Sequence, residues 1–274
     1  MRAPAMGTAG RETRRGRSAR NDAKSAALAE ALLWAWEEGE DASPGERGLI
    51  LLGLAAPSLA EEDRNSLTVG RRDAILIDLF ERLFGEVATA LADCPGCSEE
   101  LEFDIPLAEI RVSAPPDRPD RFRLTWSGHE IAYRLPQSRD LAALGAEPGN
   151  RAAASAARSL AERCILAIDD ADGTPAGLTL LSGAAPALEA AIAASVAEAD
   201  PQAVVALAFD CPSCARHWQS PFDIVEFLWR RLDAMAQGLL REVHVLASHY
   251  GWGEREIVLL SPRRRRHYLR LIGA

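Results

Sequence analysis

Two short cysteine pairs lie far apart in the chain. The first is in DCPGCSEELEFDI (residues 93–105) and the second is in DCPSCARHWQSPFDI (residues 210–224). The four cysteines are Cys94, Cys97, Cys211 and Cys214. A Cys-x-x-Cys turn lets two thiolates bind one metal ion, and a structural zinc ion takes four such ligands in a tetrahedron. Each phrase is therefore interpreted as half of one Zn²⁺ site, a zinc ribbon split by an insertion.

Other uses of these thiols are less consistent with the sequence around them. A thioredoxin-type redox motif would place each pair at the start of a long helix. The first pair runs instead into a predicted strand, and the second meets Ser220-Pro221 too soon. Disulfides are disfavoured in the reducing cytoplasm, where we expect the chain to reside. The fifth cysteine, Cys164 in AERCILAI, is expected to be a packed core thiol rather than a ligand.

The four cysteine ligands and the absence of catalytic motifs both argue against an enzyme. Four protein ligands leave a zinc ion no open position for water, so the metal would be structural. The sequence contains no G-x-S-x-G, no G-x-x-x-x-G-K-[ST] and no H-E-x-x-H motif. We therefore predict a protein that is not an enzyme, with no catalytic residues and no small-molecule substrate.

A basic tail and a helical region are predicted to precede the first cysteine pair. Residues 1–21 lack apolar periodicity and are expected to be disordered. Residues 22–92 are predicted to be helical: Asp22 caps a first helix, and Ser43 followed by proline begins a second. TVGRRDAILIDLFERLFG places an apolar stripe on a third helix, which should stop at Gly85.

Residues 93–221 are predicted to form the split zinc ribbon and a small antiparallel sheet. Strand-like composition recurs at residues 101–105, 122–126, 131–135 and 204–210. An alanine-rich insertion, about residues 139–200, contains two helical pieces, NRAAASAARSLAERCILAI and PALEAAIAASVAEAD. The two cysteine turns thus lie outside the insertion, one on each side of it.

Residues 222–274 are predicted to be helical. Apolar residues from Ile224 to Tyr250 recur at steps of three and four, which predicts one helix about 40 Å long. Short helices should follow, one after Gly253 and one from Ser261-Pro262. The predicted fold class is α+β: a helical N-terminal layer, a small sheet with split zinc-ribbon knuckles, and a long C-terminal helix followed by short ones. We expect the zinc ion to join the N-terminal half to the long helix and set its angle.

Charge is unevenly distributed along the 274 residues. Residues 1–24 and residues 262–274 each carry +5, which leaves −19 for residues 25–261 out of the total of −9. A basic helix in an acidic chain can pack on its own protein, bind an acidic partner or bind nucleic acid. Nucleic acid is the least favoured of these, because Tyr268 is the one aromatic residue among the C-terminal arginines.

The sequence shows no uninterrupted apolar run of the length that spans a membrane. The arginine-rich N-terminus also lacks the apolar stretch of a secretory signal. We therefore expect a cytoplasmic protein that does not bind membranes.

Several phrases together resemble one protein family. VGRRDAILIDLFERLFG followed by CPGCSEELEFDI, and later REVHVLASHYGW and EIVLLSPRRRRHYLRLI, are similar to baseplate hub assembly proteins of T-even-type phages and of contractile, phage-tail-like injection systems. The resemblance covers roughly residues 66–105 and 210–273.

This resemblance implies a non-enzymatic assembly factor or minor baseplate component that binds other baseplate or tail proteins. It implies that the four cysteines are metal ligands. It also marks a second group of positions for partner binding: Trp252, Arg264, Arg265 and Arg266. The chain could then be part of a phage-tail-like particle. The alternative function is that of a nucleic-acid-binding zinc ribbon, which steep salt-dependent binding would reveal.

Overall fold

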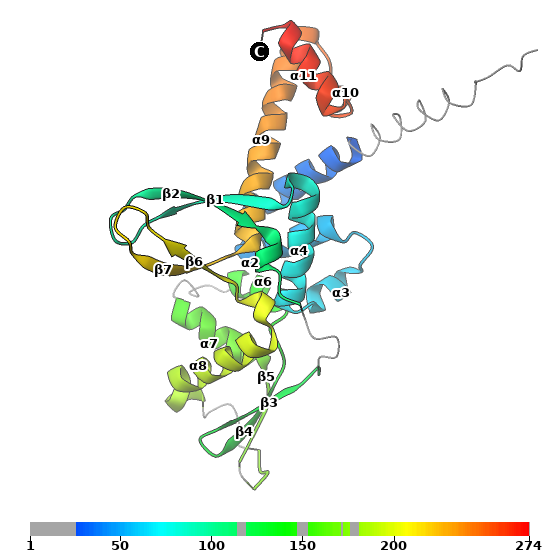
Figure 1. Ribbon diagram of the computed structural model, residues 1–274. Helices are drawn as coiled ribbons and strands as arrows, with labels where there is room; N and C mark the ends of the chain where they lie inside the picture. The colour runs from blue at the N-terminus through cyan, green and yellow to red at the C-terminus, as the bar shows by residue number, and fades with distance from the viewer. Residues whose placement is uncertain (1–25, 114–118, 147–152, 171, 176–180, 274) are drawn as a thin grey trace, which may run out of the picture. The chain divides into compact units, whose positions relative to one another are not determined.

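The computed structural model describes residues 26–113, 119–146, 153–170, 172–175 and 181–273 (Figure 1). The fold class is α+β, as the sequence predicts. The chain divides into a central unit, residues 41–229, and a terminal unit, residues 1–40 with 230–274. The predicted disordered tail, residues 1–21, lies outside the described residues.

The central unit begins with three helices: α2 (Pro44–Ala55), α3 (Glu61–Ser66) and α4 (Val69–Phe84). Ser43 caps α2 as predicted, because its hydroxyl accepts a bond from the Glu46 N–H while the Glu46 carboxylate accepts one from the Ser43 N–H. The predicted stop at Gly85 is also confirmed, since this residue follows α4 with a φ of 98° that favours glycine.

A buried aspartate holds the start of α4 against the chain that leads to the second cysteine turn. The Asp200 carboxylate is 1% exposed and accepts a hydrogen bond from the Gly70 N–H at 2.9 Å. A Cβ at Gly70 would lie 2.1 Å from Asp200 Oδ1, so only glycine allows this approach. The negative charge also lies where the N-terminal end of the helix dipole is positive, which stabilises both.

Strands of the described residues form separate antiparallel sheets rather than one. Two hairpins consist of β1 (Val87–Asp93) with β2 (Glu100–Pro106), and of β6 (Ala206–Asp210) with β7 (His217–Pro221). A third sheet has the order β3 (Phe122–Trp126), β4 (His129–Tyr133) and β5 (Ile165–Asp169).

Two segments predicted to be helical are strands. Residues 87–92 belong to β1, and residues 165–168 belong to β5. Both segments are rich in alanine or isoleucine, for which local propensity is a weak guide. Pairing decides the outcome: Ala88 lies opposite Ile105, and Ile168 lies opposite Ile131. Tertiary contacts therefore override the local pattern in both places.

The insertion between the cysteine turns folds around its own core. Its helices are α6 (Ser138–Ala146), α7 (Ala153–Cys164) and α8 (Leu181–Ala199), preceded by the short α5 (Leu107–Ile110) and followed by the 3₁₀ turn η2 (Pro201–Ala203). Buried residues of the three-stranded sheet, α7 and α8 form one cluster. Tyr133 and Ile131 from β4 meet Leu188 and Ile192 from α8 in this cluster, and each of the four is at most 3% exposed. The insertion is thus a packed subdomain rather than a loop.

The long predicted helix is confirmed as α9 (Ile224–Tyr250), with 27 residues. Its first residues belong to the central unit, where Phe227 contacts the rings of Phe80 and Phe222 at 5.4 and 5.6 Å. Ile224 and Leu228 are at most 2% exposed. The start of α9 is therefore anchored in the core of the central unit, three residues after the hairpin that carries Cys211.

The terminal unit packs a helix over residues 26–39 against the rest of α9, α10 (Glu254–Val258) and α11 (Pro262–Leu271). Leu246 and Ile257 are fully buried at its centre. The Trp36 indole N–H donates to Asp233 at 2.8 Å, which joins the first helix to α9 across 197 residues of sequence. No helix among the described residues is long and apolar enough to span a membrane.

Candidate metal centre

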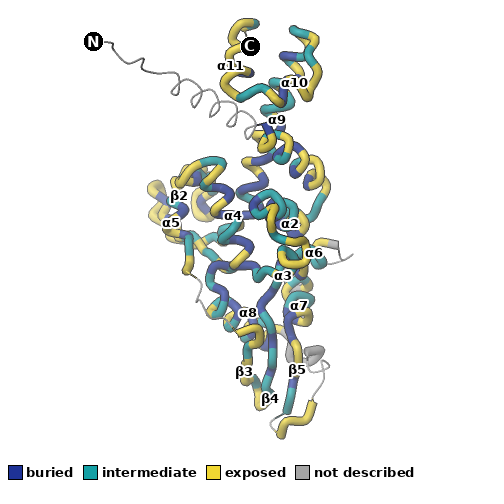
Figure 2. Tube along the Cα trace, turned by 90° about the vertical axis from the view of Figure 1, so that its right-hand side faces the viewer, coloured by how far each residue is buried: buried dark blue, intermediate teal, exposed yellow. Residues whose placement is uncertain are grey.

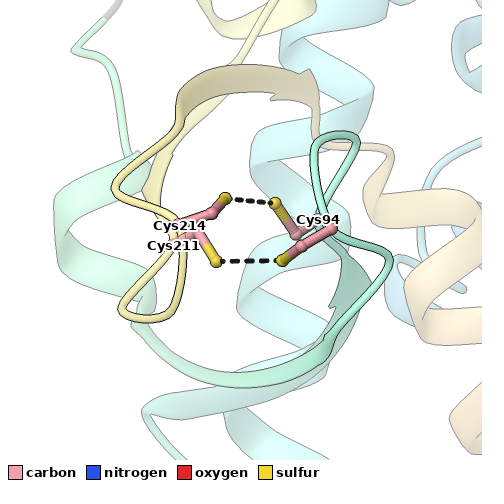
Figure 3. Close-up of side chains that lie close together, drawn as sticks. Cys94, Cys211 and Cys214 are labelled. Atoms are coloured by element: carbon pink, nitrogen blue, oxygen red, sulfur yellow. Dashed lines mark hydrogen bonds between the residues drawn. The ribbon is translucent and has the colours of Figure 1, made fainter.

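The four cysteines of the two pairs occupy the tips of two hairpins. Cys94 follows β1 directly and Cys211 follows β6 directly, while Cys97 and Cys214 lie in the turns that lead to β2 and β7. Figure 3 shows the two turns facing each other, with the sulfur atoms pointing into the space between them. Segments more than a hundred residues apart in sequence thus come together at one point.

The first turn is closed by backbone hydrogen bonds around Cys94. The Ser98 N–H donates to the Cys94 carbonyl at 2.8 Å, and the Cys94 N–H donates to the Glu99 carbonyl at 2.9 Å. Ser98 takes a φ of 60°, which turns the chain back toward β2. The Gly96 N–H points at Cys94 Sγ at 3.3 Å, so the backbone donates a hydrogen bond to this sulfur.

The second turn repeats these bonds. The Ala215 N–H donates to the Cys211 carbonyl at 2.9 Å, and the Cys211 N–H donates to the Arg216 carbonyl at 3.0 Å. Ala215 has a φ of 55°, close to that of Ser98. The repeated Asp-Cys-Pro-x-Cys phrase therefore encodes one local structure twice.

The sulfur positions fit a tetrahedral metal. Cys94 Sγ lies 3.6 Å from Cys214 Sγ, and Cys97 Sγ lies 3.6 Å from Cys211 Sγ (Figure 3). All four sulfurs lie within 4.8 Å of one another. A tetrahedron of Zn–S bonds of about 2.3 Å has edges of about 3.8 Å, whereas a disulfide would bring two sulfurs to about 2.05 Å. The arrangement can hold one metal ion, and its donors are all thiols.

One of these thiols is favoured as a thiolate. Burial opposes a charge on Cys94, which is 1% exposed, but hydrogen bonds from the Gly96 and Cys97 backbone lower its pKa to about 6. Thiolates are the form that binds zinc, and backbone N–H groups aimed at a sulfur stabilise that form. The local backbone thus assists the chemistry that the residue types suggest.

An apolar cluster supports the two hairpins behind the sulfurs. Phe103 of β2 contacts the ring of Phe209 of β6 at 4.5 Å, and Phe209 stacks on Trp218 of β7 at 5.2 Å. Leu101 is buried beside the cysteines in the same cluster. These ring contacts join the two hairpins behind the sulfurs and add to what a metal ion would contribute.

Gly96 is a residue that sequence reasoning missed. It is the variable residue of Cys-Pro-x-Cys, and a Cβ there would lie 3.3 Å from Cys214 Sγ of the opposite turn and 2.8 Å from Arg216 Cδ. The variable residue of the second turn is Ser213, which already carries a side chain. The sequence signal for this role is that the first Cys-Pro-x-Cys turn has glycine where the second has serine.

We predict that Gly96→Ala weakens metal binding by about tenfold or more, in the range seen when groups around metal ligands are changed. The added methyl must displace either Cys214 Sγ or the Arg216 side chain. Competition titration with a chromogenic chelator measures the effect. Ser213→Ala is the matched control and should bind metal like the wild type. Equal affinities for the two variants and the wild type would contradict the assignment of Gly96.

Cys164 lies outside this cluster, as predicted. It ends α7, is 1% exposed, and burial raises the pKa of its thiol to about 12. A thiol that stays protonated in an apolar site behaves as a small core residue. Cys164 therefore differs from the four clustered cysteines in both its location and its surroundings.

The positions predicted for partner binding lie in the terminal unit and differ in exposure. Trp252 is half-buried, stacks on Tyr250 at 4.6 Å and meets the edge of Tyr268 at 4.9 Å. Arg264 and Arg266 are exposed. Trp252 thus has a packing role within the unit, and the partner-binding role of all these residues stays a prediction.

Arg265 differs from its neighbours because it is buried, with 7% exposed. Its guanidinium pairs with the Glu242 carboxylate at 2.6 Å and donates to the Leu260 carbonyl at 2.7 Å. This pairing joins α11 to α9 and satisfies a carbonyl at the end of α10. In a run of four arginines, the sequence carries no signal for which one faces inward.

Comparison with known proteins identifies the family. The family model described as T4 bacteriophage base plate protein matches residues 51–229, which include both cysteine turns and the alanine-rich insertion. No curated protein and no solved structure matches the chain. The family match spans most of the central unit and confirms the baseplate resemblance found in the sequence, so the chain belongs to the T4 bacteriophage base plate protein family.

Proposed function

We propose that the chain is a non-enzymatic assembly factor or minor structural component of the baseplate of a contractile, phage-tail-like particle, and that it contains one structural zinc ion. The observation that carries the proposal is the family match over residues 51–229, a family of structural phage baseplate proteins. We infer that its partners are other baseplate or tail proteins.

The zinc assignment rests on the donor set. Four sulfurs within 4.8 Å of one another suit a soft or borderline metal in a tetrahedral site, and zinc is the common ion of this class. Cys94, Cys97, Cys211 and Cys214 would bind it. With all four positions taken by protein, the metal would supply stability rather than chemistry, which fits a structural role.

The metal would fasten together the hairpins on either side of the insertion. Each hairpin has only two strands, and isolated two-stranded hairpins are marginally stable in water. The β6–β7 hairpin ends at Pro221, and α9 begins at Ile224. We infer that the closed metal site stabilises the segment from which α9 starts, so that a partner meets one defined surface.

Deleting the gene from the host of the particle should abolish particles with complete baseplates, as seen by electron microscopy of purified material. Wild-type protein supplied in trans should restore them, and the Cys94→Ser, Cys97→Ser variant should not. The Cys164→Ala variant is the control and should restore assembly. Complete particles in the deletion strain would overturn the proposal. Mass spectrometry of those particles separates the two roles, because a component remains in the particle and an assembly factor does not.

A further inference from the structure

One face of the β1–β2 hairpin is strongly acidic and has no cation of its own. Residues 86–110 contain seven Asp or Glu residues and no Lys, Arg or His. We name as the acidic hairpin face the side chains that share one side of the two strands: Val87, Thr89, Leu91, Asp93, Glu100, Glu102 and Asp104. Among the described residues, none of its carboxylates forms an ion pair.

The register of the hairpin places like charges together. Asp93 lies directly opposite Glu100, and Leu91 lies opposite Glu102. Like charges directly across a strand pair are destabilising, so this arrangement costs the hairpin stability. Large apolar side chains lie between them on the same face: Leu91 is 62% and Val87 is 49% exposed. An exposed apolar centre bordered by carboxylates is suited to bind a basic amphipathic surface.

The complementary surface lies on α11 of the terminal unit. We name as the arginine face the residues Arg263, Arg266 and Arg270, which line one shallow groove with Leu269. All three arginines are exposed, on a helix whose trace is mostly exposed in Figure 2. Among the described residues, none of the three forms an ion pair. Arg265, on the other side of the helix, is occupied by Glu242.

The arginine face is also unfavourable in the isolated chain. Arg263 and Arg266 are three residues apart and Arg266 and Arg270 four, spacings at which like charges on a helix repel. Arg263 also lies in the first turn, where the helix dipole disfavours a cation. Leu271, at the end of the same helix, is 65% exposed. Both faces therefore carry unpaired like charges, of opposite sign, and an exposed apolar residue lies within or beside each of them.

We propose that this protein associates with itself head to tail: the arginine face of one copy binds the acidic hairpin face of a second copy. The two surfaces are different, so the contact is heterologous, and repetition produces either a closed ring or a chain. Carboxylates pair with guanidinium groups, and Leu91 and Val87 become covered. The proposal is independent of the zinc ion and of the identity of other baseplate partners.

A charge exchange tests this contact. The first variant carries Glu100→Arg and Glu102→Arg, and the second carries Arg263→Glu and Arg266→Glu. Neither should destabilise the fold. Glu100→Arg places a cation opposite Asp93 across the hairpin, and Arg263→Glu places an anion in the first turn of α11, where the helix dipole favours it. The first variant takes the net charge of the hairpin face from −4 to 0, and the second takes that of the arginine face from +3 to −1, so either variant alone removes the charge attraction.

Sedimentation velocity of nuclease-treated, zinc-loaded full-length protein gives the readout. Wild type should form oligomers at low salt that dissociate at high salt, since screening weakens exposed ion pairs. Either variant alone should have a dissociation constant raised about tenfold or more. An equimolar mixture of the two should associate again, because the first variant keeps the arginine face and the second keeps the acidic hairpin face.

The control carries Arg231→Glu and Arg241→Glu, two exposed positions of α9 that change the net charge by the same amount as the α11 variant. It should associate like the wild type. Wild-type protein that sediments as a monomer at low salt at every concentration would overturn the proposal. So would oligomers that nuclease treatment removes, or a mixture of the two variants that fails to associate.

Discussion

Replacing Cys94 and Cys97 by serine should remove one zinc ion from each chain and unfold the two cysteine hairpins. The expected loss of stability is large, because the free energy of metal binding contributes to the free energy of folding. In small zinc fingers the apparent binding free energy is about 10–16 kcal/mol at neutral pH. The present site should contribute less than that, since Phe103, Phe209 and Trp218 already pack the hairpins together. We expect a loss of several kcal/mol, which is still a large fraction of the stability of an ordinary domain.

Elemental analysis of protein purified under reducing conditions should find one zinc ion per wild-type chain and none in the serine variant. Trp218 reports the local structure, because its edge contact with Phe103 of the other hairpin, at 6.4 Å between ring centroids, should be lost when the hairpins separate. The far-ultraviolet signal should change little, since the insertion has its own core around Tyr133 and Leu188. Acidification should likewise release the metal as the thiolates become protonated.

Cys164→Ala provides the matched control, because it removes a thiol that is buried outside the cluster. It should retain one zinc ion and the Trp218 signal. Wild-type protein that is fully reduced and yet contains no metal would contradict the assignment. Zinc retained at full stoichiometry after both cysteines are replaced would contradict it equally.

Arg265→Ala should destabilise the terminal unit by about 3 kcal/mol, the lower part of the range for removing one partner of a buried ion pair. The Arg265 side chain is 8% exposed and the Glu242 side chain 29%, so the carboxylate that remains keeps some contact with water. The Leu260 carbonyl also loses its donor. The change removes one link between α11 and α9, while Tyr268 and Leu269 still pack in the same cluster.

Urea denaturation monitored by circular dichroism measures this effect, and Arg264→Ala is the control. Arg264 is exposed, so its replacement should change the free energy of unfolding by at most about 0.5 kcal/mol. A double-mutant cycle with Glu242→Ala should show coupling between Arg265 and Glu242. Equal effects of the two arginine replacements would show that the buried ion pair is not what distinguishes them.

The cluster of four cysteines could be predicted from the sequence because its chemistry is local. A Cys-Pro-x-Cys turn brings its own two thiols together, and two copies supply the four ligands that a tetrahedral ion needs. The helices α4 and α9 were predictable for the same reason, since their apolar stripes and end signals lie within the helix itself.

What local pattern could not decide was decided by contacts between distant residues. The alanine-rich segment from Val87 becomes a strand because its partner β2 lies beside it, and residues 165–168 become a strand because β4 pairs with them. A Cβ at Gly96 would press on Cys214 Sγ and on the Arg216 side chain of the distant second turn, and Arg265 is distinguished from three identical neighbours by Glu242 on another helix. The sequence by itself determined which four cysteines can bind a metal ion together and where the main helices lie, because side-chain chemistry and helical periodicity act over a few residues. Only the tertiary structure decided strand pairing, burial within the arginine run and the spacing of the sulfurs, because these depend on which distant surfaces meet.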